Sequence, residues 1–595
     1  MSRAIQDGTI LKPTENAANE IVPSKGIVNG TTSSNGATKR EYRFAPNRLP
    51  RFPLPDINAL CDAFLTGVKA FATPSEFANT LRAVEDFKQP GGQGQLLYSR
   101  AAARAADPSV ENWEYELQLQ RGFLDRRVSL TPCTSFWFSH PLSTRQHSQA
   151  ERAALLAYTI NNFKLKLDAG LVEPEVLNER ELTTAFHKWI FNTVRVPGVD
   201  SDEMVKHPNN DYCVVFWKGH AYKLSLCTRD QPATYQELFT AFELILRQPV
   251  ARSFVTILTA DNRRPWAEAR QQLQLHDSQN AANIKTIEAA AFSVSLDEAN
   301  PTTAAERGRQ FHFGGEKDAA NRWHDKSLQF VVCSNGASGT IGEHTMLDAL
   351  TLGKLNDAIA AAISSHSHTE AGTMSATTTT TLEPLPLKID LKLEAHIEKV
   401  RVQYADSIKD AEHAYFSFEG YGSKALRAVK MSPKSVFQLV VQLAAHSTFG
   451  YTPPCWETVN QAHYHLGRVD IIQVVNPQVA AFLAAARDPS VDLPERRALL
   501  IKATRAHIAS INKAGRNLGW ERNLTALRAL LENGEQVPAL YEDPVYKKVR
   551  PRVMMSNCFE TGMLEKGCMW KAPEAVWSHY EVYDERYVFI PPLTI

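Results

Sequence analysis

Strand-like and helical patterns alternate in the first half of the chain, and this alternation constrains the fold more than any other feature. Residues 212–217 (YCVVFW) and 254–258 (FVTIL) are short runs rich in β-branched and aromatic side chains, as in buried strands. Residues 265–275 follow with a helical pattern. Such alternation is typical of sheets layered with helices, so we predict an α/β fold.

The chain has 595 residues, more than a single hydrophobic core organises, so we expect two or more domains. Residues 1–42 are rich in Asn, Ser, Gly and Thr and are expected to be disordered or loosely attached. A threonine- and proline-marked segment, 371–386, is predicted to be a linker or an exposed excursion. The chain therefore divides into an N-terminal helical plus α/β domain (43–385) and a C-terminal α/β domain (387–595).

The second domain repeats the alternation of patterns. We predict helices and strands there, with the helices at 388–399, 433–446 and 494–513 and the strands at 470–475 and 587–590.

Composition excludes several classes of protein. Lys+Arg and Asp+Glu balance at 65 each, so bulk charge gives no reason to expect nucleic acid or an anionic membrane as partner. The eight cysteines are scattered without a C-x-x-C pair, which favours a reduced compartment and argues against structural zinc. His366 and His368 are more typical of a solvated linker than of a metal site. With no apolar run of membrane length, no signal peptide and no C-terminal peroxisomal tripeptide, we expect a cytoplasmic monomer.

The segment 321–350 carries the strongest chemical signal. His344 follows Glu343, and Asp348 lies four residues later, which would place His344 and Asp348 on one face of a predicted helix. An imidazole has a pKa near neutrality and can take a proton from a hydroxyl. However, most of the 18 histidines must be solvated or hydrogen-bonded core residues, and Asp348 could equally be a solvated carboxylate. The pattern alone leaves both interpretations open.

The same segment, NRWHDKSLQFVVCSNGASGTIGEHTMLDAL, resembles the catalytic block of the choline/carnitine O-acyltransferase family. That block reads N-R-W-[FY]-D-K-x-L-Q-F, a glycine-containing turn, then Y-E-H-x-x-x-E-G. This chain departs from it at His324, Gly342 and Asp348, which replace an aromatic residue, the tyrosine and the second glutamate. Other matches follow in the family's order from about residue 45 to about residue 590, among them RFPLP (51–55), PGGQG (90–94), NTVRVPG (192–198), WKGHAYK (217–223), WAEAR (266–270), MSP (431–433) and LGRVD (466–470).

The resemblance implies two domains of chloramphenicol-acetyltransferase-like topology, with mixed sheets flanked by helices and an active-site tunnel between them. It also implies that His344 is the catalytic base, with Glu343 and Asp348 beside it. The histidine would deprotonate an acceptor hydroxyl, which attacks the thioester of acyl-CoA. No resident cofactor is implied, because CoA enters and leaves as a co-substrate.

The family contacts CoA through lysines that precede its L-S-P motif. Here Ser423 stands at the first lysine and Arg427 at the second, with Lys424 and Lys430 nearby. We expect Lys424, Arg427 and Lys430 to bind CoA phosphates. A solvated basic helix would look the same, and the missing first lysine leaves a carrier-protein thioester open as donor.

The acceptor pocket departs most from the family. Trp456 replaces the tyrosine and Val469 the threonine that hold carnitine's carboxylate, whereas Arg516 is kept. Each lost hydrogen-bond partner of a buried charge costs roughly 1–3 kcal/mol, so carnitine should bind poorly. The family's S-T-S motif falls on Ser556, Asn557 and Cys558, and the thiol of Cys558 is a weaker donor than a hydroxyl. Trp456 and Val469 could also merely pack, with the pocket slightly displaced.

Three hypotheses follow. The first is an acyltransferase that acts on a non-carnitine alcohol such as a polyketide or terpenoid, similar to divergent family members of fungal specialised metabolism, with a polyketide synthase carrier domain as one donor. The second is a carnitine O-acyltransferase with unusual pocket residues, which Arg516 favours. The third is a binding protein that no longer transfers acyl groups, which the replacements at Ser423 and Cys558 favour.

Overall fold

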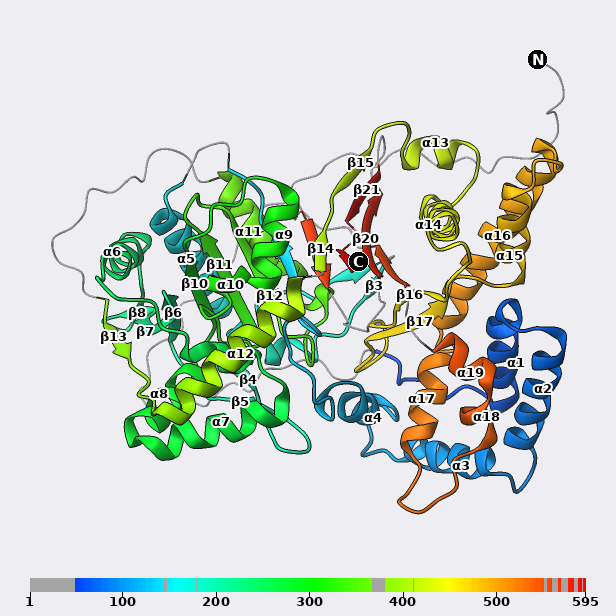
Figure 1. Cartoon of the computed structure of the whole chain (residues 1–595), viewed down its shortest axis with the longest axis horizontal. Helices are drawn as coiled ribbons and strands as arrows, with labels where there is room; N and C mark the ends of the chain where they lie inside the picture. Colours follow the sequence, from blue (N-terminus) through cyan, green and yellow to red (C-terminus); the bar gives the residue numbers. More distant parts are fainter. Residues whose placement is uncertain are drawn as a thin grey trace, which may run out of the picture. The chain divides into compact units, whose positions relative to one another are not determined.

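Two large mixed β-sheets flanked by helices organise the part of the chain that the structure describes (Figure 1). This computed structural model describes residues 49–143, 147–177, 179–365, 380–409 and 411–550, and the backbone of five strands between residues 554 and 594. The prediction of an α/β fold is confirmed. The segment 1–42 and the histidines at 366 and 368 lie outside the described residues.

The larger sheet has eight strands among the described residues. Their order is β13 (Leu382–Leu385), β7 (His220–Ser225), β6 (Tyr212–Trp217), β10 (Ser293–Asp297), β11 (Leu328–Cys333), β12 (Ser338–Gly342), β1 (Phe136–Ser139) and β19 (Glu565–Cys568). β10 runs parallel to both neighbours, and the other pairs are antiparallel. Every residue of β10 and β11 is buried, as expected of central strands covered on both faces.

The second sheet has six strands in the described part of the chain. Their order is β15 (Phe416–Phe418), β21 (Tyr587–Ile590), β20 (Val576–Val582), β18 (Met554–Cys558), β16 (Cys455–Asn460) and β17 (Val469–Gln473). β18 is parallel to β16 and β20. Helices α14 (Pro433–Phe449), α15 (Pro477–Arg487) and α16 (Leu493–Ala514) pack on one another beside this sheet.

The remaining elements are helices, short helical turns (η) and short strands that connect or cover the two sheets. They are α1 (Ile57–Val68), η1 (Lys69–Phe71), α2 (Pro74–Lys88), α3 (Gln93–Ala106), α4 (Tyr115–Leu119), η2 (Gln120–Leu124), α5 (Gln149–Asp168), β2 (Val176–Leu177), β3 (Arg180–Glu181), η3 (His187–Trp189), β4 (Thr193–Val196), β5 (Glu203–Lys206), β8 (Cys227–Thr228), β9 (Gln231–Pro232), α6 (Tyr235–Leu246), η4 (Val255–Ala260), α7 (Arg263–His276), α8 (Ser278–Ala289), α9 (Ala304–Phe313), α10 (Gly315–Asp318), η5 (Ala349–Leu352), α11 (Gly353–Ser365), α12 (Leu391–Lys409), β14 (Ala411–His413), α13 (Ser423–Ala428), α17 (Glu521–Ala529), α18 (Ala539–Glu542), α19 (Pro544–Val549) and β22 (Pro592–Thr594).

Segments from the two halves of the sequence are interleaved. β19, from the second half, pairs with β1 in the first sheet. The N-terminal helix α1 packs Phe64 against Trp520, with the ring centroids 5.2 Å apart. Both rings belong to one hydrophobic core that also includes strands of the first sheet. The division into domains at residues 43–385 and 387–595 stays a prediction.

Most predicted elements are present, with two corrections. The predicted helices of the second half coincide with α12, α14 and α16, and the predicted strands with β17 and β21. Residues 254–258 are not a strand: they overlap η4, whose six residues are all buried. Periodicity cannot distinguish a short, fully apolar strand from a buried helical turn. The end of the predicted linker is also different, because Leu382–Leu385 forms edge strand β13, where Pro384 is tolerated.

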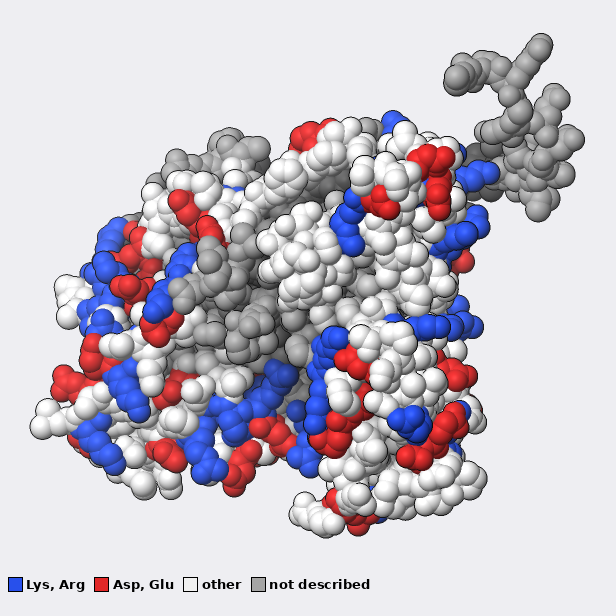
Figure 2. Space-filling view, turned by 45° about the vertical axis from the view of Figure 1, so that its right-hand side comes forward, with Lys and Arg blue, Asp and Glu red and all other residues white. Residues whose placement is uncertain are grey.

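Charges are mixed over the surface. Figure 2 shows acidic and basic side chains interspersed on the face that it draws, in keeping with the equal totals of 65. In the described residues, no helix is long and apolar enough to cross a membrane.

Candidate active site

His344 lies in a tight turn directly after β12, and the predicted helix that would carry it with Asp348 is wrong. Residues 344–346 form the turn, and Asp348 is the N-cap of η5. Within this turn the backbone N–H of Thr345 donates to Glu343 Oε2 at 3.1 Å, a local bond that competes with helix formation. The turn still brings the two side chains together, with 3.5 Å between His344 Nδ1 and Asp348 Oδ1.

The hydrogen bonds of His344 define which nitrogen is basic. Nδ1 lies 2.8 Å from the carbonyl oxygen of Leu347, which can only accept, so Nδ1 carries the proton of the neutral ring. Nε2 is then the nitrogen with the lone pair. Burial lowers the pKa of His344 below its usual value, although the neighbouring carboxylate of Asp348 opposes that shift. The imidazole is therefore neutral at pH 7, the form that a general base requires.

Arg468, which directly precedes β17, holds the carboxylate of Asp348 in place. Its Nε and Nη2 donate to the two carboxylate oxygens at 3.0 and 2.7 Å, the geometry of a bidentate pair. Nη2 also donates to the carbonyl of His344 at 2.9 Å, and Nη1 to that of Thr345 at 2.5 Å. Burial alone would raise the pKa of Asp348, but Arg468 lowers it below the usual value, so Asp348 is ionised.

Two aromatic rings enclose this arginine and the histidine. The guanidinium of Arg468 lies 4.8 Å from the ring centroid of Phe123 and 5.7 Å from that of Phe186. The ring of Phe123 is 5.9 Å from that of His344. The side chains of His344 and Asp348 nevertheless remain 19% and 17% exposed, so the pair is only partly shielded from solvent.

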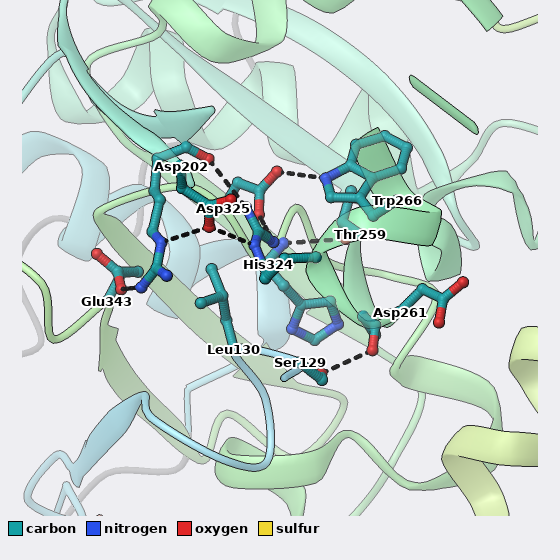
Figure 3. Close-up of polar contacts among 12 residues, drawn as sticks. Ser129, Leu130, Asp202, Thr259, Asp261, Trp266, His324, Asp325 and Glu343 are labelled. Atoms are coloured by element: carbon teal, nitrogen blue, oxygen red, sulfur yellow. Dashed lines mark hydrogen bonds and ion pairs between the residues drawn. The ribbon is translucent and has the colours of Figure 1, made fainter. Parts of the chain in front are cut away.

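A buried network of charged side chains connects the His344 turn to strand β4 and to the start of helix α7 (Figure 3). Arg195 of β4 donates to Thr345 Oγ1 at 2.9 Å and lies 3.4 Å from Glu343 Oε1. Glu343 Oε1 in turn accepts from Thr345 Oγ1 at 2.6 Å. Of the two carboxylates predicted to lie beside the base, Glu343 thus holds the turn and Asp348 lies at the ring of His344.

The network continues away from the turn through alternating charges. Arg195 and Arg263 both donate from Nε to Asp202 Oδ2, at 2.8 and 2.7 Å. Arg263 Nη1 also donates to Asp325 Oδ1 at 2.6 Å, and the indole of Trp266 donates to Asp325 Oδ2 at 2.6 Å. Burial raises the pKa of Asp325 to about 6 despite the opposing charge of Arg263.

Two departures from the family's catalytic block have packing explanations. A Cβ atom at Gly342 would lie 2.3 Å from the ring of Phe136, so glycine makes room for that ring. The Phe136 ring packs edge-on to His344 with 5.0 Å between centroids. His324 bonds the carbonyl of Ala319 at 3.1 Å, and burial lowers its pKa to about 3, so it is a neutral core residue.

The residues expected to bind CoA lie around helix α13. Lys424 and Arg427 are on α13 and exposed, and Lys430 follows the helix with a left-handed φ of 58°. Ser423, at the position of the family's first lysine, is buried. All of these residues lie in one short basic segment immediately before the MSP motif.

The residues expected to bind the acceptor are spread out. Trp456 is fully buried and packs on Trp520 with 5.4 Å between ring centroids. Val469 pairs with Asn460, whereas Trp456 pairs with Gln473; at about 3.3 Å per residue, the ladder separates Trp456 and Val469 by about 13 Å. Val469 directly follows Arg468 and is the first residue of β17. Arg516 is exposed, and its Nε donates to the carbonyl of Asn512 at 3.1 Å.

Ser556 and Cys558 lie on β18, whose backbone alone is described. Ser556 pairs with Glu457 of β16, and Cys558 pairs with Tyr580 of β20. In the described residues no group of three or more His, Cys, Asp or Glu side chains is arranged to hold a metal ion.

Comparison with known proteins gives the family of the chain. The choline/carnitine O-acyltransferase family matches residues 52–591, and the chain belongs to this family. It is thus a member of an acyltransferase family.

Its relatives include much longer proteins. A highly reducing polyketide synthase of Aspergillus luteorubrus is 35% identical over 555 residues, which cover 91% of this chain and 17% of the synthase. Another, from Metarhizium anisopliae, is 32% identical over 534 residues, with 89% and 17% covered. Carnitine O-acetyltransferase of Rattus norvegicus is 27% identical over 548 residues, covering 89% of this chain and 86% of that enzyme. The chain spans 17% of the length of these synthases.

Proposed function

We propose that this chain transfers an acyl group from a thioester, carried by CoA or by a carrier protein, to a hydroxyl of a small-molecule acceptor other than carnitine. The observation that carries the proposal is the neutral, Nδ1-protonated His344 held by Asp348 and Arg468. Nε2 takes the proton of the acceptor hydroxyl as its oxygen attacks the thioester carbonyl. The tetrahedral intermediate then collapses, the C–S bond breaks, and the departing sulfur takes the proton from the imidazolium.

The acceptor side supports an alcohol that lacks carnitine's carboxylate. Val469, next to Arg468, offers an apolar branch where the family offers a hydroxyl. The exposed Arg516 already donates to a backbone carbonyl. The binding free energy of carnitine would be weaker by roughly 1–3 kcal/mol for each hydrogen-bond partner that its carboxylate lacks.

The proposal is tested by mixing the protein with acetyl-, butyryl- and octanoyl-CoA and a panel of acceptors that includes carnitine, glycerol and longer polyols. Mass spectrometry should detect new esters of an acceptor other than carnitine, with carnitine esters formed at least about 10²-fold more slowly. A carnitine ester formed at the highest rate would instead establish a carnitine O-acyltransferase, which the similarity to the rat enzyme favours. If no ester forms with any acceptor, the chain does not transfer acyl groups from CoA.

Restoring the hydroxyl at Val469 should improve the use of carnitine. Val469→Thr is expected to raise kcat/KM for carnitine roughly fivefold, the equivalent of one hydrogen bond of about 1 kcal/mol. Val469→Ile is the matched control, because it changes shape without adding a hydroxyl. Equal gains in both variants would mean that pocket size, rather than a missing hydrogen bond, limits carnitine.

Asp348 and Arg468 should shift the pH profile in opposite directions, since each acts on His344 through its charge. Activity needs the neutral imidazole, so it is lost as pH falls through the lowered pKa of His344. Asp348→Asn removes a charge that raises this pKa, and the acid limb of the kcat/KM profile should move to lower pH. Arg468→Gln removes a charge that lowers it, and the limb should move to higher pH.

Both substitutions should also lower kcat at the pH optimum by up to about 10²-fold, since the base is less well oriented. If the acid limbs of the two variants' kcat/KM profiles move in the same direction, or do not move, the two residues do not act through the ring of His344.

A further inference from the structure

Residues just before the MSP motif form an exposed aromatic patch, defined here as Phe416, Phe418, Tyr421 and Val429. Phe416 is 57% and Val429 54% exposed, although both are strongly apolar. Phe416 and Phe418 are two residues apart on β15 and so project from the same face of that strand. The rings of Phe418 and Tyr421 meet edge-on, with their centroids 5.0 Å apart. Exposed apolar groups that gather along one short segment in this way mark an interaction surface.

The aromatic patch is followed in the sequence by a segment whose Lys and Arg side chains face no Asp or Glu within the same segment. Residues 420–456 contain four basic side chains, at Lys424, Arg427, Lys430 and Lys434, and no Asp or Glu. The whole chain, by contrast, has equal totals of 65 basic and 65 acidic residues. All four basic residues are exposed, on α13, after it, or in the first turn of α14. Helix α13 packs against α14, and in Figure 1 it follows β15 directly along the chain. The exposed Glu419 lies between Phe418 and Tyr421, so this apolar segment carries four basic side chains against one acidic side chain.

We propose that the aromatic patch and its basic rim dock an acyl carrier domain, which presents the acyl thioester on a phosphopantetheine arm beside an acidic surface. This inference rests on the proposed function, since it names the donor for the same site. The segment is the one expected to meet the phosphates of CoA, and the arm of a carrier domain ends in the same pantetheine thioester. The buried Ser423 replaces the lysine expected to contact CoA at this entrance.

Charge complementarity and position together favour this occupant. CoA by itself offers no protein surface to cover four apolar side chains. A carrier domain does, and its acidic side chains would pair with the basic rim. The two polyketide synthases similar to this chain are much longer than the matched segment, which covers 17% of each, so their acyltransferase-like part is one portion of a larger chain.

The test compares two donors that differ only in the carrier. One is a fungal polyketide synthase carrier domain loaded with butyryl-phosphopantetheine, and the other is butyryl-pantetheine. Phe416→Asp and Val429→Asp place like charge opposite an acidic partner. Leu275→Asp, at a 78% exposed position on α7, is the matched control. We expect kcat/KM for the carrier-bound donor to fall at least tenfold in the two patch variants and not in the control, with butyryl-pantetheine unaffected in all three.

Binding separates this inference from the proposed function. The Kd of the loaded carrier domain, measured by fluorescence anisotropy, should rise at least tenfold in the patch variants. Patch-dependent binding without any ester product would support docking and refute the proposed transfer. Equal loss with both donors, or a wild type that uses the carrier domain no better than butyryl-pantetheine, would overturn the docking inference. Two further results would overturn it. One is flotation of the wild type with phosphatidylserine vesicles that the patch variants lose, and the other is a wild-type dimer that the patch variants abolish.

Discussion

Replacement of His344 with alanine is expected to lower kcat by about 10²- to 10⁴-fold, the usual contribution of a positioned general base. The loss should be confined to chemistry, because the ring of His344 contacts Phe123 and Phe136, which lie outside the basic segment around α13. Single-turnover transfer from butyryl-CoA measures the chemical step, and calorimetry measures CoA binding. The Kd for CoA should stay within about twofold of wild type.

His344→Gln serves as the companion variant, since the amide can keep a hydrogen bond to the Leu347 carbonyl but cannot accept the proton at working pH. It should be as inactive as alanine while preserving the fold, as judged by circular dichroism. Near-wild-type turnover in either variant would rule out His344 as the base.

Removal of Arg263 is expected to destabilise the fold by about 3–5 kcal/mol, the cost of leaving a buried ion pair without one partner. Arg263→Leu keeps apolar volume but removes the one charged partner of Asp325 named above and one of the two arginines that donate to Asp202. Arg264→Leu is the matched control. Arg264 pairs with the exposed Asp200 at 2.5 Å, and its own side chain is 53% exposed. That change should stay within about 0.5 kcal/mol. Urea denaturation of the three proteins measures the difference.

The sign of the pH dependence provides a second check. Without Arg263 the pKa of Asp325, already raised to about 6 by burial, rises further. A carboxyl whose pKa is higher in the folded state than in the unfolded state is penalised at neutral pH and less so at lower pH. The deficit of Arg263→Leu relative to wild type should therefore shrink between pH 7.5 and pH 5.5. A deficit equal to that of Arg264→Leu at all pH values would mean that the network contributes little to stability.

The local chemistry of the site was readable from the sequence, because His344 and Asp348 are neighbours in the chain. The hydrogen bonds around these two side chains could not be read from the sequence. Arg468 lies 124 residues from His344, and its motif, LGRVD, had directed attention to Val469 rather than to the arginine. The sequence did offer one signal, the arginine within LGRVD. This arginine could have been considered as an ion-pair partner for Glu343 or Asp348.

The spacing of His344 and Asp348 led to a wrong prediction of local structure. An i, i+4 pair predicts a helix face, but Glu343 bonds the backbone and hydroxyl of Thr345 and folds the segment into a turn. The donor that stabilises Glu343, Arg195, is 148 residues away, so no local pattern could show which acid faces the histidine. The sequence nominated both acids, and the turn leaves Asp348 at the ring.

The sequence by itself determined the α/β class, most of the helices and the family, and it singled out His344 as the candidate base, since periodicity and motifs are properties of neighbouring residues. Only the tertiary structure decided that His344 lies in a turn, that Nδ1 carries its proton, and that an arginine from the second half of the chain holds its acid. It also decided that Trp456 packs in the core and lies apart from Val469 along the β16–β17 ladder. The physical reason is that burial and hydrogen bonding depend on contacts between distant segments, which the order of residues does not specify.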